Sequence, residues 1–289
     1  MGYLVAITIL WAFSFSLIGV YLAGQVDAYF SVLTRVALAT VIFLPFIRRV
    51  PLALAVKLMV LGAIQLGCMY VFYYKSFLLL SVPEVLIFTI LTPVYVTLIY
   101  DLLQRRFSYR YLVTALVAVL GAAIIRYSTI GSEIFTGFLV VQGANICFAI
   151  GQVGYKVLLQ REDLPLPQRA IFGYFYLGAL AVTTATWFLF GNPAKLPTTS
   201  LQWEILLYLG LVASGLGYFF WNKGATKVDA GTLAIMNNAL VPAGLLVNLL
   251  IWNRDANLTR LCIGGAVLLF SLVLHEYWGK KRRFELQPD

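Results

Sequence analysis

The sequence predicts an all-α membrane protein whose ten transmembrane helices form two inverted five-helix repeats, and three observations support this fold class. Of its 289 residues, 61% are hydrophobic and only 11% are charged, whereas soluble domains carry about 25% charged residues. The apolar residues form long blocks, such as 7–20 and 261–274, and a helix needs roughly 20 such residues to cross a bilayer. The two halves of the chain also carry related motifs in the same order.

Polar breaks divide the chain into ten predicted spans that are joined by short connections. The spans lie near residues 3–23, 28–47, 56–74, 83–100, 109–126, 134–158, 170–190, 203–221, 230–252 and 259–277. Five spans per half is an odd number, so the second half must enter the membrane from the opposite side. We therefore expect a first repeat over 1–128, a second, inverted repeat over 132–279 and a basic cytoplasmic tail over 280–289.

Basic residues orient the predicted bundle. Of the 21 Lys and Arg residues, fifteen lie at span ends on the side of the N-terminus, five lie on the other side, and Arg35 lies within a span. Because positive charge favours the cytoplasmic side of a membrane, both termini are expected in the cytoplasm, with the chain in a bacterial inner membrane. This topology explains the net charge of +9. The expected partner is therefore the lipid bilayer, and no nucleic-acid partner is expected.

Arg35 is the strongest single indication of function. It lies about eight residues into the second span, roughly 12 Å deep at 1.5 Å per residue, where an uncompensated charge costs a few kcal/mol or more. Its planar guanidinium suits a substrate carboxylate. We expect it to face a central cavity within reach of ninth-span polar groups such as Asn238. The alternative is an internal tie, to Glu84 or to backbone carbonyls released by a proline.

Two prolines near the middle of a span, Pro93 and Pro242, occupy corresponding places in the two halves. Each removes one helical hydrogen bond and releases the carbonyl four residues earlier, which belongs to Thr89 or Asn238. In a bilayer a released carbonyl favours a polar cavity; the alternative is a kink that serves packing or gating. Glu84, at the outer end of the fourth span, is a candidate for proton exchange or for capping that helix.

Several amide and aromatic side chains within spans are candidates for substrate binding. The amides are Gln65, Asn145, Asn237 and Asn238. Amides offer both donors and acceptors and suit a neutral polar group such as a urea; the alternative is contact between helices, worth about 0.6–1 kcal/mol each. Trp11 and Tyr70 are placed where rings could flank a ligand. Most aromatic residues at 70–74, 172–176 and 218–221 are interpreted as interfacial belts.

The sequence argues against catalysis, metals and cofactors. It has one histidine, which excludes a His-based metal cluster or a Ser-His-Asp arrangement deep in the bundle, and it lacks the GxxxxGKS/T phosphate loop. Cys68, Cys147 and Cys262 lie within apolar blocks without metal-ligand spacing and are interpreted as small buried residues. We therefore expect a protein that is not an enzyme and that binds no cofactor or metal.

Several motifs resemble the half-repeat of the EamA family, within the drug/metabolite transporter superfamily. They are LWAFSF, an arginine within the second span, LTPVYVTLI and GAAII in the first half, and ANICFAIGQVGYKVLL, VPAGLLVNLLIW and GGAVLL in the second. Two departures stand out: Ala12 stands where the family usually has glycine, and the acidic residue usual after the fourth span is replaced around 104–106. The resemblance implies a secondary transporter of ten helices.

A narrower resemblance, carried by AIQLGCMY, NICFAIGQVGYK, VASGLGYFFWN and VDAGTLAIMNNALVPAGLLVNL, is to biotin transporters of this family. It implies import of a small carboxylate, biotin, whose ureido ring suits amides, whose apolar parts suit aromatic rings and whose carboxylate suits Arg35. Two alternatives stay open: an exporter of amino acids or related metabolites, and a membrane scaffold that binds partner helices. The sequence also leaves open the transport direction, the energy coupling and a homodimer.

Overall fold

The computed structural model describes residues 1–105, 132–162 and 166–252, together with single helical positions between 259 and 277. This part of the chain holds eight helices that are long and apolar enough to cross a membrane, and they match eight of the ten predicted spans. The fifth span, at 109–126, and the tail at 280–289 lie outside the described residues, and the tenth, at 259–277, lies almost wholly outside them. The chain is thus an all-α, multi-pass membrane protein.

The four described spans of the first half are interrupted helices. The first two consist of α1 (Gly2–Leu17) with the π-helical η1 (Ile18–Leu22), and of α2 (Ala28–Phe43) with the 3₁₀ turn η2 (Leu44–Phe46). The third consists of α3 (Leu52–Gly62), the π-helical η3 (Ala63–Cys68) and α4 (Met69–Ser76). The fourth consists of α5 (Val82–Phe88), the 3₁₀ turn η4 (Thr89–Leu91) and α6 (Thr92–Leu103).

The described spans of the second half are more regular. Three are continuous helices: α8 (Ser132–Arg161), α9 (Gln168–Phe190) and α12 (Ala230–Ile251). The eighth span consists of α10 (Ser200–Leu207), the π-helical η5 (Tyr208–Leu216) and α11 (Gly217–Ala225). The two mid-span prolines therefore differ in effect. Pro93 lies in the first turn of α6 after a break in the helix, where its missing N–H is not needed, whereas Pro242 lies inside the continuous α12.

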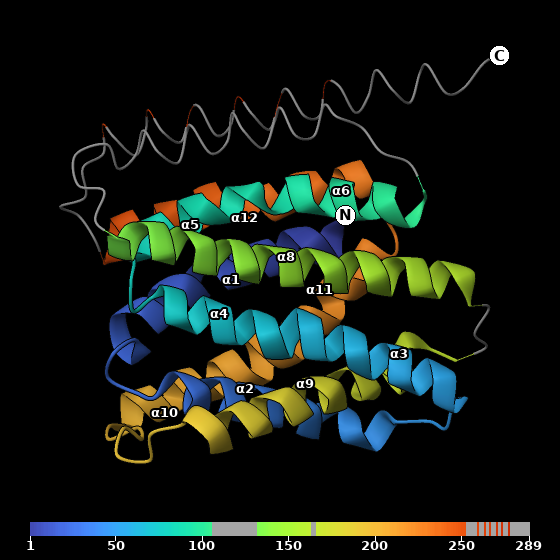
Figure 1. The fold of residues 1–289 in the computed structure, drawn as a ribbon, viewed down its shortest axis with the longest axis horizontal. Coiled ribbons are helices and arrows are strands. Elements are labelled where there is room, and N and C mark those ends of the chain that lie inside the picture. The colour runs from blue at the N-terminus through green and yellow to red at the C-terminus, as the bar shows by residue number, and fades with distance from the viewer. Residues whose placement is uncertain are drawn as a thin grey trace.

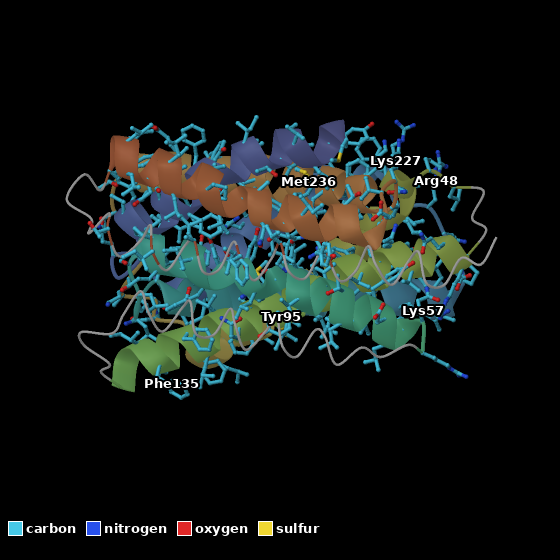
Figure 2. The ribbon with its side chains drawn as sticks, turned by 90° about the horizontal axis from the view of Figure 1, so that it is seen from above. Arg48, Lys57, Tyr95, Phe135, Lys227 and Met236 are labelled. Atoms are coloured by element: carbon cyan, nitrogen blue, oxygen red, sulfur yellow. The ribbon has the colours of Figure 1, made fainter. Side chains whose placement is uncertain are left out.

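One end of the bundle gathers basic residues, and we call it the basic end. Figure 2 shows Arg48, Lys57 and Lys227 there, and Lys57 forms an ion pair with Glu162 at 2.9 Å. Tyr3, at the start of α1, lies with its ring centroid 5.3 Å from Lys227 Nζ. The N-terminus therefore lies at the basic end. The sequence predicts this arrangement, because most basic residues lie at span ends on the side of the N-terminus.

The first helices of the two predicted repeats, α1 and α8, run in opposite directions (Figure 1). Helix α1 begins at the basic end, whereas α8 ends there, where Arg161 donates to the carbonyl of Leu103. The packing is reciprocal as well: α1 packs on α11 and α12, and α8 packs on α4 and α6. Inverted repeats would produce this pattern, and the superposition of the halves stays a prediction.

The third and seventh spans cross in backbone contact. A Cβ atom on Gly62 would overlap the carbonyl of Phe175, and a Cβ atom on Gly178 would overlap the carbonyl of Met59. Only glycine fits at either position. Small residues that let backbones approach closely are the main means by which helices associate in a bilayer. The crossing fixes α3 against α9 and so supports α4, which carries part of the site described next.

Candidate functional site

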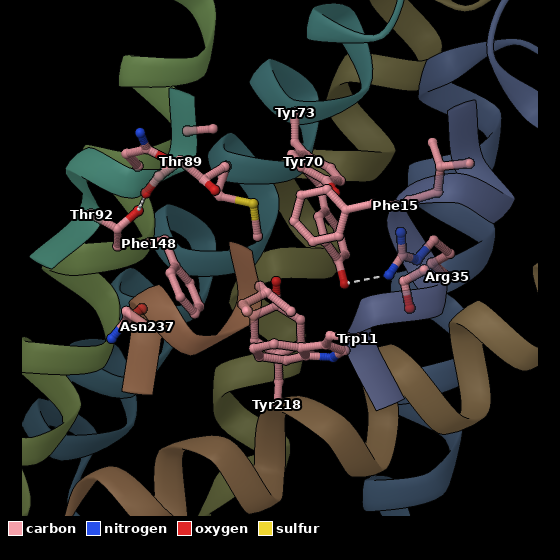
Figure 3. Close-up of a pocket in the computed structure, with 16 residues that line it drawn as sticks. Trp11, Phe15, Arg35, Tyr70, Tyr73, Thr89, Thr92, Phe148, Tyr218 and Asn237 are labelled. Carbon is pink, nitrogen blue, oxygen red and sulfur yellow. Dashed lines mark hydrogen bonds between the residues drawn. The ribbon is translucent and has the colours of Figure 1, made fainter. Parts of the chain in front are cut away.

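A cavity lies between the two halves of the bundle, close to the middle of the spans. It encloses about 630 Å³ of space not filled by atoms, its open side included. Its wall consists of Trp11, Ser14, Phe15, Ile18, Arg35, Met69, Tyr70, Tyr73, Thr89, Thr92, Ala144, Asn145, Phe148, Tyr218, Asn237 and Leu240. In Figure 3, Arg35 lies at one end, Thr89, Thr92 and Asn237 lie at the other, and aromatic rings lie between.

The guanidinium of Arg35, whose side chain is only 3% exposed, forms the first end. Its Nε donates to Ser214 Oγ at 3.0 Å, Nη1 to Tyr74 OH at 3.2 Å and Nη2 to Tyr70 OH at 2.8 Å. Its Cζ also lies 4.3 Å from the centroid of the Tyr70 ring, a cation–π distance. These bonds use three of the five N–H donors, and none of the three partners is acidic. The guanidinium thus keeps two donors and a positive charge that these contacts do not neutralise, which suits a carboxylate.

Ser214 reaches Arg35 from a π-helical part of the eighth span. Side chains of other spans donate to carbonyls of η5: Trp11 Nε1 donates to Ala213 O at 2.8 Å, and Tyr176 OH donates to Ser214 O at 2.8 Å. Single π-helical turns occur frequently at functional sites. The arginine end is therefore assembled from five spans whose side chains and carbonyls hold one another in place.

Aromatic rings form the walls between the two ends. The ring centroid of Trp11 lies 4.8 Å from that of Tyr218 and 6.0 Å from that of Phe148. On the other side, Phe15 and Tyr73 meet edge to face at 5.2 Å. Such arrangements add roughly 0.5–1.5 kcal/mol per pair beyond the area that they bury. The middle of the cavity can therefore hold an apolar body against rings that are already packed.

The second end of the cavity is built around the break in the fourth span. The carbonyl of Phe88, the last residue of α5, accepts hydrogen bonds from Asn145 Nδ2 at 3.0 Å and Gln142 Nε2 at 3.3 Å. The hydroxyls of Thr89 and Thr92 donate to carbonyls three residues earlier, at 2.6 and 2.7 Å. Side chains thus satisfy the carbonyls at the break, as a bilayer requires, and Asn145, Thr89 and Thr92 also line the cavity.

Asn237 joins this end of the cavity to a buried network. Its Nδ2 donates to Leu233 O at 2.8 Å and to Gln152 Oε1 at 3.1 Å, and its Oδ1 accepts from Gln152 Nε2 at 3.2 Å. Trp221 Nε1 donates to the same Gln152 Oε1 at 3.0 Å. Gln152 lies on α8 nearer to Arg161 than Asn145 does, so the network lies on the side of the cavity that faces the basic end.

Five of the seven predicted substrate-binding residues lie in the cavity wall: Trp11, Arg35, Tyr70, Asn145 and Asn237. Gln65 and Asn238 are buried elsewhere, and their side chains have no hydrogen-bond partner in the described part of the chain. The prediction that Asn238 lies within reach of Arg35 is therefore wrong in that no hydrogen bond joins the two side chains. Adjacent residues point about 100° apart on a helix, so only Asn237 of the pair faces the cavity.

Glu84 closes a capping box at the start of α5, where its Oε2 accepts the N–H of Ser81 at 2.9 Å. Such reciprocal bonds satisfy N–H groups that a helix leaves unpaired, so the capping interpretation is confirmed. Proton exchange at Glu84 stays a prediction, as does gating at Pro93 and Pro242.

Sequence reasoning missed several residues of the site. Tyr74 and Tyr218 belong to aromatic clusters at span ends that are typical of interfacial belts, although the spacing of Tyr70 and Tyr74 places them on one helix face. For Thr89 the sequence indicates only a carbonyl released by Pro93. Ser214 lies among small residues in ASGLG, and no sequence signal reveals its role, because the direction of its side chain depends on the π-helical turn.

Comparisons with known proteins agree with this architecture. Residues 135–277 match the EamA-like transporter family. The chain is 58% identical to a protein of Pseudomonas aeruginosa named probable biotin transporter, over 94% of this chain and 96% of that protein. It is 52% identical to the biotin transporter of Escherichia coli K12, over 100% of this chain and 97% of that protein. A solved crystal structure that is 18% identical has the same fold, with a TM-score of 0.68 over 94% of this chain and 95% of that chain.

Proposed function

Because the chain belongs to the EamA-like transporter family, we propose that it is a secondary transporter that imports biotin across the bacterial inner membrane. Its relatives in P. aeruginosa and E. coli that are named biotin transporters share more than half of their residues with it over nearly their full length. The observation that carries the proposal is the polarity of the cavity. An arginine forms one end, amides and hydroxyls form the other, and aromatic rings lie between.

The proposed orientation follows from the order of groups along biotin. The carboxylate takes the two remaining N–H donors of Arg35, since charge-assisted hydrogen bonds between guanidinium and carboxylate are about twice as strong as neutral ones. The methylene tail and thioether ring lie against Trp11 and Tyr218. The ureido ring then reaches Asn145 and Asn237, at the break in the fourth span.

Import requires the site to open to each side of the membrane in turn, and inverted halves provide two equivalent ways to do so. We assign the basic end to the cytoplasm, because positive charge is retained there. The network of Asn237, Gln152 and Trp221 then lies between the cavity and the cytoplasm, and its opening releases biotin inward. One chain supplies the whole wall of the cavity, so the proposal does not depend on a homodimer.

The two alternatives are less well supported. An exporter of amino acids would have to accommodate an ammonium group beside the carboxylate, next to Arg35, where the partners of the guanidinium are hydroxyls and none is acidic. A scaffold would be expected to have a dry, tightly packed interior with its charges paired. The cavity, and the absence of an acidic partner among the three hydroxyls that bind Arg35, favour a transporter instead.

Uptake of labelled biotin tests the proposal. Cells that lack other routes for biotin and express this chain should accumulate the label with saturation, and unlabelled biotin should compete. The Arg35→Gln variant should lose most of this uptake, whereas Arg49→Ala, a change at an exposed arginine outside the spans, should retain it. If a folded protein in the membrane produces no uptake, and if the purified protein binds no biotin, the proposal is wrong.

A further inference from the structure

We propose that the cavity end remote from Arg35 is a subsite that accepts N–H groups and offers no donors, so that it selects the ureido nitrogens of biotin. This inference deepens the proposed function and rests on it. The basis is the pattern of hydrogen bonds at this end of the cavity. The polar protons of four side chains are already donated to other groups of the protein; the four are Asn145, Thr89, Thr92 and Asn237.

Asn145 presents only an oxygen to the ligand. Both hydrogens of its Nδ2 are used, one toward Phe88 O at 3.0 Å and one toward Gln142 Oε1 at 3.0 Å. A backbone carbonyl can only accept, so the bond to Phe88 fixes which side of the amide is nitrogen. The remaining group, Oδ1, is an acceptor on a side chain that is 4% exposed and lies in the cavity wall.

The two threonines are committed in the same way. A hydroxyl has a single proton, and those of Thr89 and Thr92 point at backbone carbonyls of the broken fourth span, at 2.6 and 2.7 Å. Each Oγ1 is left with its lone pairs. Both hydroxyls thus bond to carbonyls beside the break before Pro93, which lies between α5 and α6.

Asn237 completes the set. Its Nδ2 hydrogens go to Leu233 O and Gln152 Oε1, and the orientation of Gln152 is itself fixed, since the indole N–H of Trp221 can only donate. Asn237 Oδ1 accepts one bond from Gln152 Nε2 and keeps a second lone pair. Four acceptor oxygens therefore meet at this end, while the arginine end offers donors.

A subsite of acceptors discriminates between ligands that have N–H groups and ligands that lack them. A ureido ring offers its two N–H groups to these acceptors, whereas a second carboxylate, an ester or a cyclic carbonate would set oxygen against oxygen. Such a ligand leaves buried acceptors unpaired. A site that hydrogen-bonds an N–H group of its ligand strongly rejects analogues without that group. The subsite thus distinguishes biotin from other carboxylates of similar length.

The test is competition binding of labelled biotin to the purified full-length protein. The competitor is the cyclic carbonate analogue of biotin, in which oxygen replaces both ureido N–H groups without added bulk. We expect it to bind at least about tenfold more weakly than biotin. Equal affinity of the two compounds for the unaltered protein would overturn the subsite and leave biotin transport standing. Absence of binding by biotin itself would instead overturn the proposed function.

A pair of variants assigns the effect to a residue. Thr92→Val removes the acceptor with little change in shape, and Thr92→Ser keeps it. Thr92→Val should weaken biotin binding roughly three- to tenfold relative to Thr92→Ser, and should not weaken binding of the carbonate analogue. A purely structural role of Thr92 would weaken both ligands equally and would remove it from the subsite. If Thr92→Val does not fold, the same comparison is made with Thr89→Val and Thr89→Ser.

Discussion

Replacement of Arg35 by glutamine separates recognition of the carboxylate from support of the fold. The guanidinium keeps two N–H donors after its bonds to Tyr70, Tyr74 and Ser214, and hydrogen bonds to charged groups contribute about 1.5–3 kcal/mol each. Two such bonds at the lower limit amount to about 3 kcal/mol, or roughly a 100-fold loss of affinity for biotin at 1.4 kcal/mol per tenfold. Biotin methyl ester carries no charge, and its carbonyl can accept one such bond, so it should lose only about tenfold.

Equilibrium competition on the purified variants measures both ligands. Arg35→Lys, which keeps the charge but not the paired geometry, should fall between the original protein and Arg35→Gln for the acid. Thermal unfolding of each variant serves as the control, because Arg35 also binds three hydroxyls whose loss of a partner destabilises the bundle. If Arg35→Gln weakens binding of acid and ester to the same extent, Arg35 is structural and the proposed orientation of biotin is refuted.

Three further predictions concern the fold and its topology. Gly178→Ala should lower the stability by about 1–3 kcal/mol or more, because its methyl group would meet the carbonyl of Met59; thermal unfolding should show no such loss for Gly2→Ala, where nothing lies within 4 Å. Trp11→Phe should cost about 0.5–1.5 kcal/mol by removing the hydrogen bond to Ala213 O, and an unchanged melting temperature would contradict this. A reporter that is active only in the periplasm should stay silent when fused after Asp289, and activity there would contradict the assigned topology.

The sequence was sufficient to predict the spans that the structure describes, because apolar length and polar breaks are local properties. It also identified Arg35, since a charge within a span stands out without any knowledge of its neighbours. The partners of Arg35 were not predictable: Ser214 is 179 residues away, and its direction depends on a π-helical turn that has no simple sequence signal. Pro93 and Pro242 look equivalent in sequence, yet only the first follows a broken helix. Long-range contacts accompany that break, since side chains of α8 donate to the carbonyl of Phe88.

The charge on Arg35 also determines which step of a transport cycle depends on the membrane voltage. With a carboxylate bound the site is electrically neutral, whereas the empty site carries one positive charge. Moving one elementary charge across the membrane is worth about 2.3 kcal/mol per 100 mV. If the carboxylate of biotin pairs with Arg35 as proposed, a negative cell interior does not oppose reorientation of the loaded site and draws the empty site toward the cytoplasm. The proposed import of biotin therefore predicts that membrane voltage slows the return of the empty carrier and not the passage of biotin.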